Sequence, residues 1–309
     1  MTVSPDISVV MSVYNGASEL RGSVESILSQ EGVDLELIVV NDGSTDDSGN
    51  ILQEYSITDQ RVRIINQENQ GLTRALIVGC AAARGEYIAR QDAGDISLPG
   101  RLIKQLNAIS ENPDSAFVSC GTRFVGPKGE YLYDVNQEKA EATSNLLTLN
   151  PDQIRGPSSH PSTLFSRSLY ERVGGYRSAF YFAQDLDLWI RLAEHGRHVV
   201  IPEILYETSV TVESISGLFR KEQVALTTIM LEGAALRRNG LSEQQILNQA
   251  ESIRPIVRRP SGRVVRARAF YFIGSCLKRR NNPQAAYYFR QALKSYPFHL
   301  KSAVRLLVG

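Results

Sequence analysis

Tyr14, Asp42 and Asp92 each stand where a short segment with the pattern of a β-strand ends. The aromatic ring of Tyr14 can stack on a nucleobase, although Tyr14 and Asn15 can equally form a simple turn that ends the segment. The carboxylate of Asp42 can accept a hydrogen bond from a base N–H or a ribose hydroxyl. These residue types suit a site for a nucleotide-like ligand.

Asp42 lies in the run Glu36-Leu-Ile-Val-Val-Asn-Asp-Gly-Ser-Thr-Asp46, in which an apolar strand pattern leads into a carboxylate and a glycine turn. The structural alternative for Asp42 is to cap the helix that follows. Ser44 and Thr45 are themselves candidates for that cap, because their hydroxyls can accept hydrogen bonds from free backbone N–H groups. We therefore expect the Asp42 side chain to be free for a ligand.

Strand and helix patterns alternate through the N-terminal part of the chain. Strands are predicted at 7–13, 35–41, 62–66, 86–91 and 116–120, and helices at 18–30, 45–55, 71–83 and 99–111. Continuous apolar strands separated by helices indicate an α/β fold with a doubly wound, mainly parallel sheet. Ligands of such sheets bind outside the C-terminal ends of the strands, which is where the three residues above lie.

The rest of the chain has an irregular middle part and a helical C-terminal part. A hairpin is predicted at 124–132, a loop rich in Pro, Ser and Gly at 150–161, and a helix at 183–195. Beyond about residue 215 the strand patterns vanish, and helices are predicted at 218–239, 264–280, 283–295 and 300–307. The pair around Asn282 is similar to one tetratricopeptide unit, but a single unit does not make a repeat array.

The composition, with 42% apolar and 22% charged residues, is that of a globular protein with a sizeable core. Cys80, Cys120 and Cys276 are widely spaced and lie outside any CxxC pattern, so we expect buried thiols in a reducing compartment, not disulfides or zinc ligands. Neither a signal peptide nor a run of about 18 apolar residues is found. We expect a soluble or peripheral protein of the cytoplasm, at most on the inner face of the membrane.

The net charge of +1 conceals an acidic body and a basic tail. Residues 254–309 hold 13 Lys or Arg and no Asp or Glu, which leaves 21 basic against 33 acidic residues elsewhere, a net charge of −12. Aromatic residues are interleaved with the basic ones, as expected for helices that lie on an anionic membrane surface. The alternative is that the tail packs on the acidic body. Since no nucleic-acid-binding motif accompanies the charge, nucleic acid is not expected as a partner.

Four blocks of the sequence, in order, resemble family 2 glycosyltransferases, which are inverting enzymes with a GT-A fold. Residues 7–48 resemble the opening of that family. The other blocks are Asn69-Gln-Gly-Leu-Thr-Arg-Ala75, Gly85-Glu-Tyr-Ile-Ala-Arg-Gln-Asp-Ala-Gly-Asp95 and Gln184-Asp-Leu-Asp-Leu-Trp-Ile-Arg191. They resemble its donor-side helix, its acidic metal motif and its catalytic helix. The resemblance covers roughly residues 5–210 and implies transfer of a sugar from a nucleotide donor, for which a UDP-sugar is expected.

The resemblance also implies a role for each matching position. The donor is expected to contact Ser12, Tyr14, Asp42, Arg74 and Asp92, and a divalent cation, Mn²⁺ or Mg²⁺, to be held by Asp92 and Asp95, with Arg90 paired to this motif. Asp185 is expected to take the proton of the acceptor hydroxyl, with His160, Gln184 and Trp189 on the acceptor side. The structural alternatives are a helix cap for Asp185, a core position for Trp189, a structural role for His160 and a surface position for Arg74.

The chain departs from the family at two positions. The third residue of the acidic motif is Gly94, where the family usually has a carboxylate, and Gln184 stands where a Glu often precedes the base. Both departures favour the alternative of a non-catalytic nucleotide-sugar-binding or scaffold subunit of a polysaccharide assembly system. A nucleotidyltransferase is disfavoured, since no basic residue precedes Arg21 after the first strand.

The resulting expectation is a GT-A-like catalytic domain at 1–214, with a donor half at 1–121 and an acceptor half at 122–214, and a basic α-helical extension at 215–309. The expected acceptors are glycans or lipid-linked intermediates, in polysaccharide, glycolipid or cell-surface glycan biosynthesis.

Overall fold

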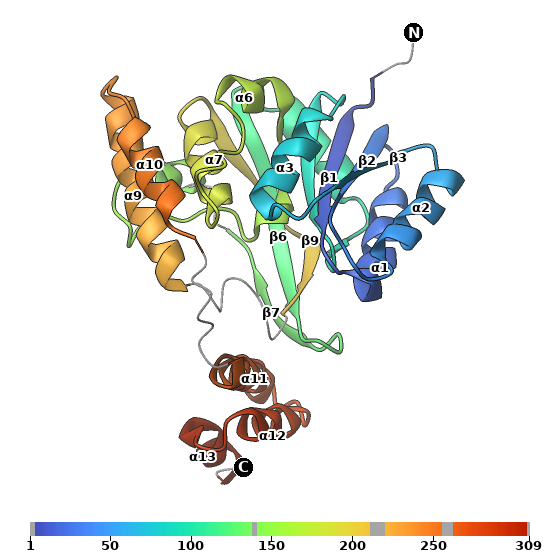
Figure 1. The fold of residues 1–309 in the computed structure, drawn as a ribbon, viewed down its shortest axis with the longest axis vertical. Helices are drawn as coiled ribbons and strands as arrows, with labels where there is room; N and C mark the ends of the chain where they lie inside the picture. The colour runs from blue at the N-terminus through green and yellow to red at the C-terminus, as the bar shows by residue number, and fades with distance from the viewer. Residues whose placement is uncertain (1–3, 138–140, 211–219, 255–261, 308–309) are drawn as a thin grey trace.

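A computed structural model describes residues 4–137, 141–210, 220–254 and 262–307 of the chain. It contains one sheet of nine strands in the order β3-β2-β1-β4-β8-β6-β9-β5, with β7 paired to β6. Helices pack on both sides of this sheet, and a group of helices at the C-terminal end lies beyond one of its edges (Figure 1).

The N-terminal half has the predicted alternation. The parallel strands are β1 (Ile7–Val13), β2 (Leu35–Asp42), β3 (Val62–Gln67) and β4 (Tyr87–Asp92), and the helices between them are α1 (Ala17–Leu28), α2 (Ser48–Thr58) and α3 (Leu72–Ala81). The four predicted strands and three predicted helices are confirmed within a few residues. The largest shift is in α2, which begins three residues later than predicted.

The other half of the sheet is mixed. It contains β5 (Ile96–Ser97), α4 (Arg101–Ser110), β6 (Ser115–Val125), β7 (Tyr131–Val135), β8 (Thr163–Ser166) and β9 (Arg197–Ser209). β8 is antiparallel to both β4 and β6, while β9 is parallel to β6. The predicted doubly wound, mainly parallel sheet is therefore confirmed with an antiparallel strand inserted in its middle. Neither β8 nor β9 was predicted from the sequence.

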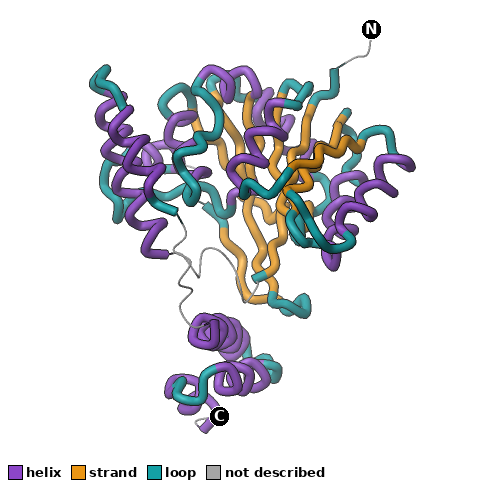
Figure 2. Tube along the Cα trace, in the orientation of Figure 1, coloured by secondary structure: helices purple, strands orange, loops and turns teal. Residues whose placement is uncertain are grey.

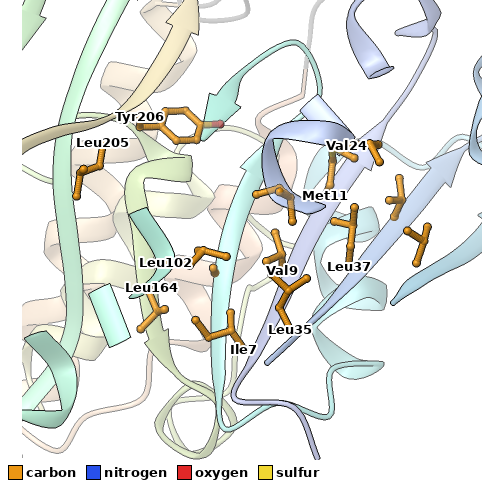
Figure 3. Packing of buried hydrophobic residues seen from close by; sticks show 14 of the residues in the cluster. Ile7, Val9, Met11, Val24, Leu35, Leu37, Leu102, Leu164, Leu205 and Tyr206 are labelled. Atoms are coloured by element: carbon orange, nitrogen blue, oxygen red, sulfur yellow. The ribbon is translucent and has the colours of Figure 1, made fainter. Parts of the chain in front are cut away.

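Apolar side chains alternate between the two faces of β1, and each face is covered by its own helices. Val9 and Met11 belong to a core with α1, α2 and α4, whereas Val10 belongs to a core with α3 and α7 (Gln184–Ala193). Figure 3 shows Val9 and Met11 beside Leu37 of β2 in the first of these cores. Burial on both faces explains why β1 and β2 are mostly apolar on both sides instead of alternating between apolar and polar residues.

The remaining helices are short between β7 and α7 and longer at the C-terminal end. They are α5 (Ala142–Leu147), the 3₁₀ helix η1 (His160–Ser162), α6 (Arg167–Arg172), α9 (Arg220–Arg238), α10 (Gln244–Ser252), α11 (Gly262–Lys278), α12 (Ala285–Ser295) and α13 (Leu300–Leu307). The expected domain boundary at 214/215 lies outside the described residues, as does the expected start of a helix at residue 218.

The C-terminal helices form two separate packing units. α9 and α10 pack on α7 through a core that includes Phe180, Ile190 and Met230. α11–α13 instead pack against β7 through a core that includes Leu132 and Tyr288, and Figure 2 shows them as a helical group beyond the end of the hairpin. Within the described residues no helix is long and apolar enough to cross a membrane.

Candidate active site

The C-terminal ends of the parallel strands meet at one edge of the sheet. β1 and β4 are in register so that Ser12 of β1 is opposite Asp92 of β4, and Tyr14 follows β1 with 54% of its surface exposed. Asp42 ends β2 at the same edge. The structure thus brings Ser12, Tyr14, Asp42 and Asp92 together where a doubly wound sheet binds its ligands.

The loops that follow β1 and β2 are bonded to each other. The Asn15 backbone N–H donates to Ser44 Oγ at 3.0 Å, and the Thr45 backbone N–H donates to Asn15 Oδ1 at 2.8 Å. The prediction that Ser44 and Thr45 cap the next helix is therefore wrong, because both are used in this contact and α2 begins only at Ser48. Asn15 fixes the turn while the Tyr14 ring stays exposed, so a structural turn and a stacking surface coexist here.

Asp42 is not free for a ligand, and that expectation is wrong. Its side chain is only 2% exposed and accepts three hydrogen bonds, from Gln67 Nε2 at 2.7 Å, the Gln70 N–H at 2.9 Å and the Gly71 N–H at 2.8 Å. Gly71 has a φ of +86°, a conformation that glycine adopts readily and other residues rarely do. Asp42 therefore fixes the turn that starts α3, whose first turn carries the exposed Arg74.

Arg90 lies fully buried beneath Asp92. Its Nη2 donates to Asp92 Oδ1 at 2.5 Å, and its Nη1 donates to the Val10 carbonyl oxygen at 2.6 Å. The expected pairing of Arg90 with the acidic motif is confirmed. The Asp92 side chain is partly exposed, and its Oδ2 accepts no hydrogen bond from the described residues. Arg90 thus orients one oxygen of Asp92 and leaves the other available to a ligand.

Asp95 is expected as a second cation ligand, but both of its carboxylate oxygens accept hydrogen bonds from the protein. Tyr206 Oη donates to its Oδ2 at 3.0 Å and Thr208 Oγ1 donates to its Oδ1 at 2.7 Å, both from β9. Burial and the nearby charge of Asp92 raise the pKa of Asp95 to about 7. Its role is to join the acidic motif to β9, so the expectation that Asp95 binds a cation is not supported by its contacts.

The donor set for a divalent cation is correspondingly small. Gly94 contributes no carboxylate, and no group of three or more His, Cys, Asp or Glu side chains within the described ranges is placed to hold a metal. Mg²⁺ is often held by one or two carboxylates together with the phosphates of a substrate. The residues present therefore fit a cation held by Asp92 and a bound diphosphate, and do not fit a cation held by protein ligands alone.

A cleft of about 480 Å³ opens next to Asp92 and contains the other expected site residues. Its lining includes Asp92, His160, Gln184, Asp185 and Trp189. Asp185 is in the first turn of α7, where the helix dipole favours an anion, and forms no ion pair with the described residues. Burial raises the pKa of Asp185 to about 6, and the charge of Asp92 contributes in the same direction. This carboxylate is accessible to a ligand and is poised to take a proton near neutral pH.

His160 forms part of the wall of the cleft. Its Nε2 lies 2.7 Å from Tyr176 Oη, and its ring meets the Trp189 ring edge to face. Burial and the Arg90 cation hold the pKa of His160 well below 6.5, so the imidazole is neutral. His160 and Trp189 therefore shape the cleft. Gln184 is buried beside Asp185 at the start of α7.

Three polar residues of the cleft were not identified from the sequence. Tyr181 comes from the loop before α7, and Gln223 and Thr227 come from α9. Tyr181 lies over Gly71 at the start of α3, and the Phe180 carbonyl oxygen accepts a hydrogen bond from Thr73 Oγ1 at 2.9 Å. The loop thereby joins the donor side to the cleft. No local pattern marks these residues, since Gln223 and Thr227 reach the site only through the packing of α9 on α7 and Tyr181 reaches it through the path of the loop before α7.

Comparisons with known proteins agree with this geometry. Residues 8–174 match the family model described as Glycosyl transferase family 2. A Bacillus subtilis (strain 168) protein named as a glycosyltransferase, EpsE, is 33% identical over 216 residues, which cover 67% of this chain and 74% of EpsE.

Two solved structures have a similar fold. The crystal structure of Staphylococcus aureus TarS 1-349 in complex with UDP has a TM-score of 0.56 at 16% identity, covering 94% of this chain and 88% of that one. The mannosyltransferase PcManGT from Pyrobaculum calidifontis in complex with GDP-Man and Mn²⁺ has a TM-score of 0.58 at 18% identity, covering 99% and 88%. Together they place this chain in the GT-A fold.

Proposed function

The chain belongs to glycosyltransferase family 2, and we propose that it transfers a sugar from a nucleotide diphosphate donor, a UDP-sugar, to a hydroxyl of a glycan or lipid-linked acceptor with inversion. The observation that carries the proposal is the position of Asp185, which lines the same cleft as Asp92 and has no ion-pair partner among the described residues. Asp92 of the proposed donor site and the proposed base thus lie in one cleft. We place the reaction in the cytoplasm, as part of glycan biosynthesis, because the three free cysteines suit a reducing compartment.

The donor is held at the strand edge. Tyr14 offers an exposed ring for the base, and Ser12 lies beside it at the end of β1. Arg74, in the first turn of α3, supplies a cation for the diphosphate, and the backbone N–H groups of that turn favour an anion as well. Asp42 acts indirectly by fixing the start of α3.

The acceptor hydroxyl reacts within the cleft. Asp185 takes its proton while the oxygen attacks the anomeric carbon of the donor and the bond to the diphosphate breaks. A single displacement from the face opposite the leaving group gives inversion, and it requires one base and no covalent intermediate. A carboxylate with a pKa of about 6 is ionised at neutral pH and is still a useful base.

A divalent cation, when bound by Asp92 together with the donor phosphates, supplies Lewis-acid stabilisation of the leaving diphosphate. The Mn²⁺ bound with GDP-Man in PcManGT supports this assignment. Arg90 holds Asp92 in place for that contact.

Calorimetric titration with UDP and with GDP, each with and without Mn²⁺, tests the donor site. We expect UDP to bind more tightly than GDP and Mn²⁺ to strengthen binding. Absence of binding by either nucleotide contradicts the proposal. The alternative of a non-catalytic nucleotide-sugar-binding or scaffold subunit rests on Gly94 and Gln184, and it requires UDP binding without hydrolysis or transfer of the sugar.

A further inference from the structure

The last three helices are strongly basic. Residues 262–307 contain ten Lys or Arg and no Asp or Glu. Within the described part of the chain, Arg290, Lys294, Lys301 and Arg305 form no ion pair with a carboxylate. The alternative that the tail packs on the acidic body to cancel its charge is therefore not realised at these positions.

An apolar row accompanies this charge on α13. Leu300, Val304 and Leu307 are spaced to share one face of the helix, and they are 76%, 55% and 85% exposed. Ser302 and Leu306, on the other side of α13, face the neighbouring helices. Lys301 and Arg305 flank the apolar row and are exposed. A short helix with an outward apolar row and a basic rim has the character of an interfacial membrane helix.

The position of these helices relative to the active site follows from the strand pairings. β8 is antiparallel to both β4 and β6, so β4 and β6 run in the same direction and end at the same edge of the sheet. The β6–β7 hairpin extends from that edge, and α11–α13 are attached to it. Tyr288 Oη donates to Glu130 Oε1 at 2.5 Å and Arg280 Nε donates to the Leu132 carbonyl oxygen at 2.8 Å. Figure 1 shows the three helices beyond the edge toward which β1 and β6 run.

We propose that the exposed face of α13, formed by Leu300, Val304 and Leu307 with Lys301 and Arg305 at its rim, docks on an anionic phospholipid bilayer. Charge complementarity identifies the bilayer as the occupant, because residues 262–307 hold ten Lys or Arg and no Asp or Glu, and such a segment attracts anionic headgroups. Docking through α13 brings the strand edge with Asp92 toward the membrane. Where the proposed function holds, this geometry selects an acceptor that is carried by a lipid.

Co-sedimentation of the full chain with vesicles tests the surface. Vesicles of equal parts phosphatidylglycerol and phosphatidylcholine should bind the protein, vesicles of phosphatidylcholine alone should not, and added salt should release it. Combining Leu300→Ser, Val304→Ser and Leu307→Ser should weaken binding by about ten-fold or more, because these side chains no longer enter the bilayer interface. The matched control is Ile57→Ser on α2, which is 75% exposed and distant from α13 in sequence and fold.

The charge contribution is tested in the same assay. A Lys or Arg near an anionic surface contributes about 1 kcal/mol, or roughly five-fold in affinity, so Lys301→Gln with Arg305→Gln should weaken binding roughly 25-fold. Arg172→Gln, at an exposed position on α6, is the control. Because all these positions are exposed, thermal melting should be unchanged and a loss of binding is not a loss of folding.

Equal binding to both vesicle types, no binding to either, or full binding by the apolar variant overturns the proposal. If light scattering shows a dimer that the apolar variant loses while vesicle binding is unchanged, the face is an interface between copies. UDP titration separates this inference from the proposed function. If the protein binds anionic vesicles but no nucleotide, the docking surface is supported and the proposed sugar transfer is contradicted.

Discussion

Asp185 and Asp187 lie two residues apart in α7 and have opposite environments. Asp187 is buried and accepts hydrogen bonds from Arg177 Nε at 3.0 Å and Arg191 Nη2 at 2.6 Å. Although burial opposes ionisation, the charges of Arg191 and Arg177 hold the pKa of Asp187 below its usual value. Asp185 faces the cleft without such a partner among the described residues, and its pKa is raised to about 6. Asp187 therefore anchors the helix, whereas Asp185 faces the cleft.

This anchoring extends to the C-terminal segment. Glu194, at the end of α7, pairs with Arg237 and Arg238 of α9, and Glu243 pairs with both Arg177 and Arg237. The ion pairs fix α7 against α9 and α10. Because Asp185 and Gln223 come from these two helices, the same network sets the width of the cleft between them.

Replacing Asp185 by Asn should abolish transfer and leave nucleotide binding intact. Loss of a general base typically lowers the rate by about 10²- to 10⁴-fold, whereas Asn fills the same space and keeps the start of α7. UDP affinity, measured by calorimetry, should stay within a few-fold of the parent value. A variant that retains more than about a tenth of the parent rate rules out Asp185 as the base.

The activity should also depend on pH through Asp185. Burial raises the pKa of this carboxyl to about 6, and only its ionised form can take a proton, so kcat/KM should be constant above that pH and fall as the pH drops through about 6. The measurement is a pH profile of initial rates at low acceptor concentration. A profile that stays flat down to pH values near 4, the ordinary range for an aspartate, contradicts a buried base at this position.

Asp187→Asn should destabilise the fold. Removing one member of a buried ion pair leaves Arg177 and Arg191 without their counter-charge, which typically costs about 3–5 kcal/mol. Urea unfolding followed by circular dichroism measures the loss. Asp134→Asn is the matched control, because its pair with Arg123 is partly exposed, at 27% and 40% of the two side chains, and should contribute within about 1 kcal/mol. Equal effects of the two substitutions contradict an anchoring role for Asp187.

Asp92 and Asp95 should respond differently to a cation. Asp92→Asn should remove the enhancement of UDP binding by Mn²⁺, because Asp92 Oδ2 is the carboxylate oxygen left open at the motif. Asp95→Asn should keep that enhancement, since Tyr206 and Thr208 already occupy both oxygens of Asp95. Titrations of the two variants with UDP, with and without Mn²⁺, distinguish them. Loss of the Mn²⁺ effect in Asp95→Asn restores the expectation that Asp95 is a ligand.

Most strands and helices of the N-terminal half could be predicted from the sequence, because each is indicated by a pattern within its own residues. Strands such as β1 and β2 are continuous apolar runs, and the helices between them have regular spacing. The missed strands are weaker: β8 has only four residues, and β9 contains Pro202 and pairs with β6 through several register shifts. Their places in the sheet depend on partners distant in sequence.

The sequence shows which residue types follow each strand, but it does not show which groups those residues will contact. Tyr14 is exposed and Asp185 lines the cleft, whereas Asp42 has the expected position but the wrong partners. A sequence pattern shows that a carboxylate follows a strand. It does not show that Gln67 and Gly71 will donate to it, because those contacts depend on the path of the next loop.

Gln223 and Thr227 should determine how the acceptor binds. Both line the cleft from α9, opposite the helix that carries Asp185, and neither is at the donor edge. Gln223→Ala removes an amide able to bond an acceptor hydroxyl, which typically contributes about 0.5–1.5 kcal/mol, so the acceptor KM should rise roughly two- to ten-fold. The KM for the donor should not change. Steady-state kinetics with each substrate varied in turn give both constants.

Val224→Ala is the matched control on the same helix, because Val224 is exposed and outside the cleft. It should leave both KM values unchanged. If Gln223→Ala and Val224→Ala have the same effect on acceptor KM, α9 only supports α7 and the acceptor does not contact it. An effect confined to Gln223→Ala instead means that a helix from outside the sheet domain supplies part of the acceptor site. In that case, relatives that differ in α9 can differ in acceptor while sharing the same donor site.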